Sequence, residues 1–549
     1  MRRAGRERLA LVALFGALVG LAWWAGRDPR LTTLEDRLRP QAVVGSSFGS
    51  GDTLRLALQE MGLIHPIPHA FRPSPEPVAL TRRAAEAPER RRHQRFYSLA
   101  PLRREQLASA LGIDPDWLAG EATLAALLVD PDELEELFAN PRQRGDDWER
   151  LGFLALVEGG ELLFSSHVGV RLHGGSSRSM RELGSFRIYF RERHGLDRVP
   201  MELFAGRRGP PPDRLVIRFD GGVDRYGHWR QFTNPLALDL ARELGLPAPY
   251  TRPVALFLNG ELAGVKSLTE WLHLDYLRSR FGHDRFTLVR TKAGAHVQGL
   301  RTLGDRPAYE ELRRWVRRAP RLELEEAAAR VDLDNLARWF LLVTFCATGD
   351  AFQGPLVREE APVGRWFWIP WDLDQSFGYP REPGDWQSDT IGSILRNGEL
   401  RGTLLRRLLK EDPRFRRHLL TVAAEALNHR WTPAVLAERA EAYARYGEIY
   451  RLEAFDPEPL RRFLAHRPQA MRELLGRHLE AGPPRRLVLS GPPGTAATVD
   501  GHPVRLPWEG WYWDGMEVEL AGPAGAGLSW RPAAPGATPE ATHRHRVAG

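Results

Sequence analysis

Two reactive residue types are nearly missing from this 549-residue chain: cysteine and lysine. The single cysteine, Cys346, excludes an intramolecular disulfide framework, and no clustered Cys and His pattern indicates a zinc site. Cys346 lies in an apolar run, which favours a buried and inert thiol over a nucleophile. Among 77 basic residues only Lys266, Lys292 and Lys410 are lysines, so arginine supplies almost all of the positive charge.

Several familiar functional motifs are also absent. The stretch 491–495 faintly resembles a phosphate-binding loop, but it lacks the Gly-Lys-Ser/Thr ending, and its prolines remove amide donors. No G-x-S-x-G elbow supports a Ser-His-Asp hydrolase. The net charge is +7 and the pI about 9.7, yet 70 acidic residues are interspersed with the basic ones. We therefore predict no nucleic-acid partner.

The N-terminus carries a membrane-targeting pattern. Four arginines, the last of them Arg8, precede an uncharged run over residues 9–26. As a helix this run spans about 27 Å, enough for the hydrocarbon core of a bilayer. We predict a single-pass cell-membrane protein with a cytoplasmic N-terminus and an extracytoplasmic bulk. A cleaved signal peptide, with Gly20–Ala22 as a weak cleavage site, stays open and would make the protein secreted.

The composition and hydrophobic pattern of the remaining chain change along its length. The predicted fold class is α+β, with a mixed antiparallel sheet, a helical lobe, an N-terminal transmembrane helix and a small C-terminal β module. The predicted segments are a membrane anchor or signal segment (1–28), an N-terminal mixed region and linker (29–128), a core (129–380), a helical lobe (381–482), and the β module with its tail (483–549).

Local signals place individual elements. Pro131 with acids in the first turn opens a helix, and 166–173 and 186–190 alternate as strands around a Gly/Ser turn. Asn259-Gly260 predicts a hairpin between strands at 253–258 and 262–268. Helices are expected at 234–244 and 333–347.

The most informative pattern is an aromatic strand that runs into acids. Trp366–Trp368 reads as a buried strand, and Asp372 and Asp374 follow it, while Asp350 ends an apolar segment about twenty residues earlier. Carboxylates among tryptophans are costly unless a cation or hydrogen bonds compensate their charge. Divalent cations prefer clustered oxygen ligands, although turn capping also explains Asp372 or Asp350.

Taken in order, several segments resemble the CotH kinase family, the spore-coat protein H type of atypical kinase. The resemblance covers about residues 130–480. The matching segments are 170–178 with 185–190, the hairpin 253–270, 332–340 with Gly349-Asp350, 369–378, and 463–467.

The resemblance implies a protein kinase that transfers phosphate from ATP, with Mg²⁺ or a similar cation, to Ser or Thr of exported or envelope proteins. It implies Asp350 as the catalytic acid that orients the hydroxyl, and Asp372 and Asp374 as metal ligands. The implied nucleotide-binding residues are Arg171, Ser176, Ser177, Arg178, Glu270 and Lys292, with Ser176 and Ser177 forming a small anion nest and Glu270 pairing with Lys292.

This chain departs from the family pattern at three places. Gly175 replaces the turn Asn, 182–184 (Glu-Leu-Gly) replace paired lysines, and Gln353-Gly354 stand where an Asn is expected. Lys266 and Lys292 also fit surface lysines. These departures keep a second hypothesis open, that of a catalytically degraded envelope scaffold or binding protein. A third is a hydrolase or transferase that uses the same acids on another phosphorylated or sugar substrate.

Overall fold

The computed structural model describes residues 104–175, 178, 184–207, 209–220, 231–283, 285–290, 301–303, 306–360, 364–378, 384–453, 455–522, 529–531 and 542–546. All of them lie in one compact unit, Met61–Gly549. The predicted membrane-spanning segment, 9–26, lies outside the described residues. Within those residues, no helix has the length and apolar character needed to cross a bilayer.

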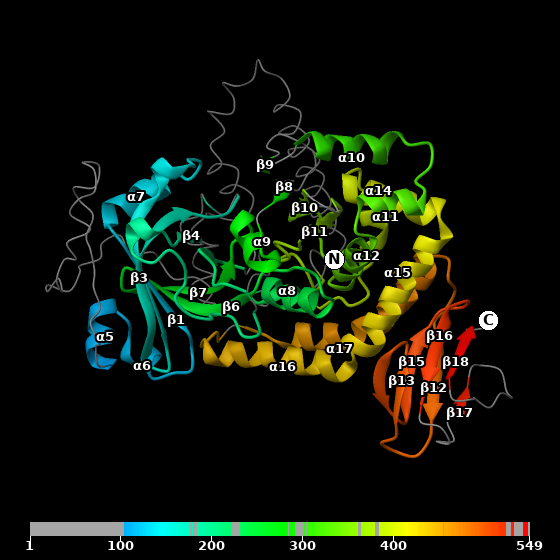
Figure 1. The fold of residues 1–549 in the computed structure, drawn as a ribbon. Coiled ribbons are helices and arrows are strands. Elements are labelled where there is room, and N and C mark those ends of the chain that lie inside the picture. Colours follow the sequence, from blue (N-terminus) through cyan, green and yellow to red (C-terminus); the bar gives the residue numbers. More distant parts are fainter. Residues whose placement is uncertain are drawn as a thin grey trace, which may run out of the picture. The chain divides into compact units, whose positions relative to one another are not determined.

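A closed barrel of seven strands forms the first half of the described chain (Figure 1). Its strands are β1 (Leu124–Val129), β2 (Arg150–Glu158), β3 (Glu161–Leu172), β4 (Phe186–Tyr189), β5 (Arg214–Arg218), β6 (Thr251–Leu258) and β7 (Glu261–Glu270). They are arranged in the order β1-β2-β3-β4-β5-β7-β6. Neighbouring strands are antiparallel, except that β1 and β6 pair in parallel and close the barrel.

The predicted fold class, with a mixed antiparallel sheet at its core, is therefore wrong, because these strands close into a barrel. The prediction from the sequence placed most of β1 in the N-terminal linker and did not identify β2. Both strands are short continuous apolar runs, buried along nearly their whole length. Such runs show no two-residue alternation, so a sequence pattern alone cannot decide whether they form buried strands or parts of helices. Because β1 pairs with both β2 and β6, it turns the sheet into a barrel.

Alternation along the barrel strands separates two cores. On β5, Leu215 and Ile217 belong to the apolar core that fills the barrel. The residue between them, Val216, belongs to a second core outside the barrel, together with Trp271 and Trp371. Successive strand residues point to opposite faces, so the next outward position on β5 is Arg218. The outer face of β5 thus faces the segment that carries the predicted acids.

The second core also includes residues of a four-stranded sheet with the order β11-β10-β8-β9. Its strands are β8 (Phe286–Arg290), β9 (Arg301–Leu303), β10 (Pro355–Glu359) and β11 (Trp366–Trp368). Helix α12 (Leu333–Phe345) starts at Asp332, whose side chain accepts the N–H of Asn335. The Asn335 side chain in turn bonds both backbone groups of Trp368, at 2.7 and 3.0 Å, and this ties α12 to β11.

Helices make up most of the rest of the chain. They are α5 (Arg104–Leu111), α6 (Pro115–Leu118), α7 (Pro131–Ala139), α8 (Thr233–Glu243), α9 (Leu274–Phe281), α10 (Arg306–Arg318), α11 (Leu324–Arg330), α13 (Ile391–Arg396), α14 (Leu400–Glu411), α15 (Pro413–Glu425), α16 (Pro433–Ile449) and α17 (Glu458–His478). A π-helical turn, Ala426–Arg430, follows α15.

The C-terminal strands form two small sheets, drawn in orange and red in Figure 1. They are β12 (Arg485–Ser490), β13 (Ala496–Val499), β14 (His502–Arg505), β15 (Trp508–Tyr512), β16 (Glu517–Ala521), β17 (Ser529–Arg531) and β18 (Thr542–Arg546). Asn428 of the π-helical turn exchanges two hydrogen bonds of 3.0 Å with the backbone of Trp511. The predicted β module thus contacts the helical lobe through a specific polar pair.

Candidate functional site

The loop after β11 holds Asp372 in an unusual backbone conformation. Asp372 has φ of 61°, in the left-handed region that costs most side chains about 1 kcal/mol or more. The start of α8 fixes this loop from the side, because Leu373 N–H donates to Asn234 Oδ1 at 2.9 Å. Thr233 Oγ1 donates to the backbone oxygen of Asp374, also at 2.9 Å. These contacts set the direction of the Asp372 side chain.

The same loop is bound to the end of α12. Phe377 N–H donates to the Cys346 carbonyl at 2.6 Å, and the hydroxyls of Thr348 and Ser376 lie 2.8 Å apart. All four positions are buried. The segment that leads to Asp350 therefore lies beside the loop of Asp372, although the two acids are far apart in sequence.

Asp350 is a half-buried acid that feels the charge of Asp372. Burial is the main cause that raises its pKa above the ordinary value, and the negative Asp372 raises it further. Gln353 Nε2 donates to Asp350 Oδ2 at 2.7 Å and opposes this shift. Buried Arg401 also opposes it and binds the loop through the Gln353 carbonyl at 3.2 Å. Gln353, which stands where the family has Asn, thus contacts the predicted catalytic acid.

A glycine allows the Asp350 loop to approach the acid-bearing segment. Gly354 has φ of +96°, and a Cβ there would lie 2.3 Å from the Ile369 carbonyl oxygen. Real Cβ atoms do not tolerate such a contact, so any side chain at this position would push the two segments apart. The close approach of the Asp350 and Asp372 segments thus depends on this glycine.

An arginine from the barrel neutralises Asp372. Arg218, at the end of β5, forms ion pairs with Asp372 and with Asp220. The side chains of Arg218 and Asp220 are 7% and 0% exposed, whereas that of Asp372 is 26% exposed. Burial lowers the pKa of Arg218, but its acidic neighbours, Asp374 included, outweigh this effect and hold it above the usual range. Sequence analysis missed Arg218 and Asp220, although alternation at the end of a strand places them on one face.

Lys266 of β7 is buried near this group. Its side chain is 1% exposed, and its Nζ lies 5.0 Å from the centre of the Phe219 ring. Within the described part of the chain, Nζ has no hydrogen-bond partner. Burial lowers the pKa of Lys266 to about 7, against the opposing charge of Asp220. The interpretation of Lys266 as a surface residue is therefore wrong.

Two predicted phosphate ligands instead contact other parts of the protein. Arg171 Nε donates to buried Glu149 at 3.0 Å. Arg178 donates to three carbonyl oxygens, among them that of Leu172 at 2.7 Å. These contacts lend no support to a phosphate-binding role for either arginine. Ser176, Ser177 and Lys292 lie outside the described residues.

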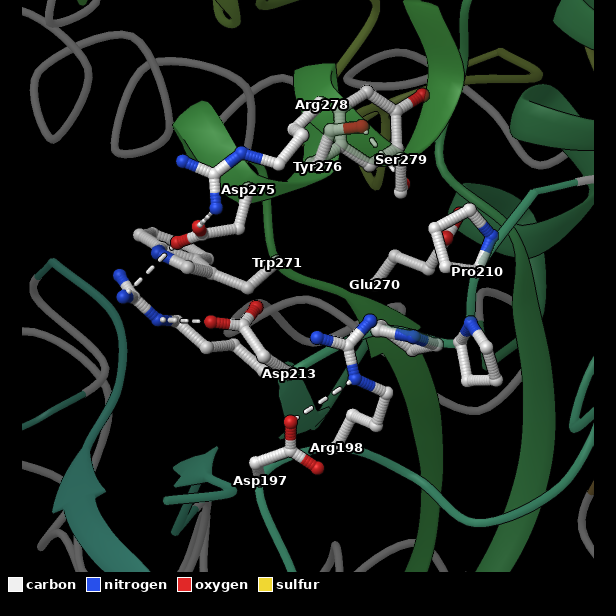
Figure 2. Close-up of a pocket in the computed structure, with 13 residues that line it drawn as sticks. Asp197, Arg198, Pro210, Asp213, Glu270, Trp271, Asp275, Tyr276, Arg278 and Ser279 are labelled. Carbon is white, nitrogen blue, oxygen red and sulfur yellow. Dashed lines mark hydrogen bonds and ion pairs between the residues drawn. The ribbon is translucent and has the colours of Figure 1, made fainter. Parts of the chain in front are cut away.

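Glu270 lies in a pocket of about 150 Å³ beside α9, shown in Figure 2. Its carboxylate is 1% exposed and accepts hydrogen bonds from Arg207 at 2.6 Å and Arg280 at 2.8 Å. The pocket also contains Asp213 and Asp275, which Arg214 bridges at 3.2 and 3.0 Å. Glu270 thus has two arginine partners, and the predicted pairing with Lys292 stays a prediction.

The acids fit a divalent cation only in part. Among the described residues, no three His, Cys, Asp or Glu side chains gather closely enough to hold a metal ion by themselves. Mg²⁺ commonly uses one or two carboxylates together with waters and substrate phosphates. Asp372, partly exposed and next to Asp350, suits this kind of shared coordination. An all-protein metal cage does not fit these residues.

Comparisons with known proteins bear on this arrangement. The family model described as CotH kinase protein matches residues 170–449, which contain Asp350, Asp372 and Asp374. A comparison with curated proteins finds no match. The matched stretch covers half of the chain, and it agrees with the resemblance of the ordered motifs. The chain therefore belongs to the CotH kinase family.

Proposed function

We propose that this protein is a phosphotransferase that moves the terminal phosphate of ATP to a Ser or Thr hydroxyl of a protein substrate. The observation that carries the proposal is the convergence of Asp350 and Asp372, brought together by hydrogen bonds between the end of α12 and the loop after β11. Family membership supports the reaction class. The exported or envelope substrate rests on the family resemblance, and the location outside the cytoplasm rests on the N-terminal sequence pattern.

In this proposal Asp350 orients the attacking hydroxyl and accepts its proton. A pKa raised by burial and by Asp372 makes the carboxylate a better proton acceptor than an exposed aspartate. Asp372 and Asp374 would hold the cation, which when bound neutralises charge on the phosphates. Arg218 holds Asp372 in place through their ion pair. Phosphoryl transfer needs little more than such positioning and charge compensation.

One contact favours a second candidate, a non-catalytic relative that acts as a binding or scaffold protein. The Arg218 guanidinium already pairs with Asp372, which lowers the need for a cation at this carboxylate. Together with the missing lysines at 182–184, this contact fits a site that no longer transfers phosphate. The same assay decides between the two candidates.

The test follows transfer of labelled phosphate from ATP with Mg²⁺ to Ser/Thr peptides and to the chain itself. We expect Asp350→Asn and Asp372→Asn to lower the rate at least about 100-fold, in the range usual for loss of a general base or a charge-stabilising group. Asp147→Asn changes an exposed acid outside the site and should keep the rate. A wild-type chain that binds ATP neither with nor without Mg²⁺ in calorimetry would establish the scaffold instead.

A further inference from the structure

The pocket in Figure 2 lies between α9 and a proline-rich segment. Pro210–Pro212 forms one wall, and residues of α9, Tyr276 and Ser279 among them, form another. Gly209 brings the two walls together, because it has φ of +92° and a Cβ there would lie 2.1 Å from the Ser279 carbonyl oxygen. Any larger residue would push the segment away from the helix. The close approach at this glycine thus gives the pocket its shape.

The charges that line this pocket are already compensated. Every carboxylate in the lining has at least one arginine partner. The pairs are Asp197 with Arg198, Asp213 and Asp275 with Arg214, and Glu270 with Arg207 and Arg280. A charged ligand would add an unmatched charge to a partly buried site, which is costly. The pocket therefore favours a ligand without net charge.

Two of the paired groups keep hydrogen-bonding capacity for such a ligand. Asp213 Oδ2 pairs with Arg214, but a carboxylate accepts about four hydrogen bonds. Arg198 donates to Asp197 only through Nε, and a guanidinium has about five N–H donors. The side chains of Asp213 and Arg198 are 27% and 47% exposed, so a ligand can reach both. In Figure 2 they lie across the pocket from the residues of α9. The pocket thus offers acceptors and donors together.

These properties match a sugar ring. Each hydroxyl of a sugar donates one hydrogen bond and accepts others, so neighbouring hydroxyls can bind a carboxylate and a guanidinium at the same time. The ring itself is uncharged, and its C–H groups can pack against the wall formed by Pro210–Pro212. The pocket has a volume of about 150 Å³, and cavities of this size hold one six-membered ring.

We propose that the pocket between Pro210–Pro212 and α9 binds an uncharged hexose ring, free or at the end of a glycan, and that Asp213 and Arg198 contact its hydroxyl groups. The inference goes beyond the proposed function, because it involves neither the acids assigned to phosphate transfer nor the nucleotide.

The test is saturation-transfer NMR and titration of the full chain, kept in a detergent without a sugar headgroup. The probes are glucose, galactose and N-acetylglucosamine, the disaccharide cellobiose, and the charged analogues glucosamine and glucuronate. We expect at least one uncharged sugar to bind with a dissociation constant of about 1 mM, the strength of a few hydrogen bonds. The charged analogues should bind at least about 10-fold more weakly.

Variants of the pocket locate the binding. Asp213→Ala and Arg198→Ala should each weaken sugar binding about 5- to 10-fold, the value of one hydrogen bond. Arg445→Ala is the matched control and should keep the affinity, because Arg445 is an exposed arginine that pairs with Glu121 at 2.8 Å outside the pocket. Thermal unfolding checks the fold of each variant. The exposed Arg198 keeps the test valid if Asp213→Ala fails to fold.

Four results would overturn the inference. They are no binding of any uncharged sugar at ten times the expected dissociation constant, binding that stays within twofold in both pocket variants, equal or tighter binding of a charged analogue, and displacement of the sugar by ATP. The last result would assign the pocket to the nucleotide.

The remaining outcomes identify the source of the sugar. Tighter binding of cellobiose than of glucose supports the end of a glycan, and the reverse supports a free sugar. Sugar binding is measured before any ATP is added, so its failure leaves the kinase proposal standing. A chain that transfers no phosphate can still bind the sugar, which supports the pocket and not the kinase.

Discussion

Replacing Arg218 tests the electrostatic design of the site most directly. Arg218→Met keeps an unbranched apolar stem but removes the charge that faces Asp220 and Asp372. Asp220 is fully buried, and its pKa is already raised by burial, which Arg218 opposes. Leaving a buried charge without its partner costs about 3–5 kcal/mol. We expect Arg218→Met to lower the free energy of unfolding by roughly this amount near neutral pH.

The assay is urea unfolding of the wild type and the variants at pH 7. Arg330→Met provides the control, because Arg330 pairs with Glu326 at the surface, where such pairs contribute at most about 1 kcal/mol. Asp220→Asn in the Arg218→Met background removes the stranded charge. Since the two changes act on one ion pair, their effects should fall short of additivity by about 2–3 kcal/mol.

Two results would refute this reasoning. A loss for Arg218→Met no larger than that for Arg330→Met would mean that Asp220 and Asp372 do not depend on the arginine. Strict additivity with Asp220→Asn would mean that the pair contributes no coupling free energy. Either result would also weaken the view that Arg218 positions Asp372.

Two further predictions concern other parts of the fold. Burial raises the pKa of Asp213 from 3.8 to about 6, so the folded state favours its protonated form. The stability that this protonation contributes is fully present below pH 3.8 and is lost as the pH rises through about 6. Urea unfolding at pH 4 and pH 7 should show the wild type losing on the order of 1–3 kcal/mol of unfolding free energy, and Asp213→Asn should abolish this loss. An unchanged pH profile in the variant would contradict this. Asn428→Ala removes both hydrogen bonds to Trp511 and should cost about 1–3 kcal/mol. Hydrogen exchange should then quicken in the C-terminal strands while the barrel strands keep their protection; equal protection in both would show that the module docks without this pair.

Much of the local structure was predictable from sequence signals. Pro131 starts α7 as predicted, with Asp130 as its N-cap, and Asn259-Gly260 makes the expected hairpin turn between β6 and β7. The aromatic run before Asp372 forms β11. These features depend on residues close together in the chain, so short-range patterns are sufficient to find them.

Contacts between distant segments were not predictable in the same way. The apolar strands β1 and β2 carry no alternation, so nothing in their own residues indicates that β1 closes a barrel. The family resemblance predicted Lys292 as the partner of Glu270, whereas the described structure pairs Glu270 with Arg207 and Arg280. Many arginines are available to each acid in this lysine-poor chain, and only the packing selects among them.

The sequence by itself determined the family, the order of the motifs and the acids proposed for the site, because these follow from residue identity and spacing along the chain. The tertiary structure alone decided that Arg218 meets Asp372 and that Lys266 is buried. Arg218 and Asp372 are 154 positions apart, and the packing of the segment after β11 against the outward face of β5 brings them together. Register depends on pairings across the whole sheet, which no local pattern records.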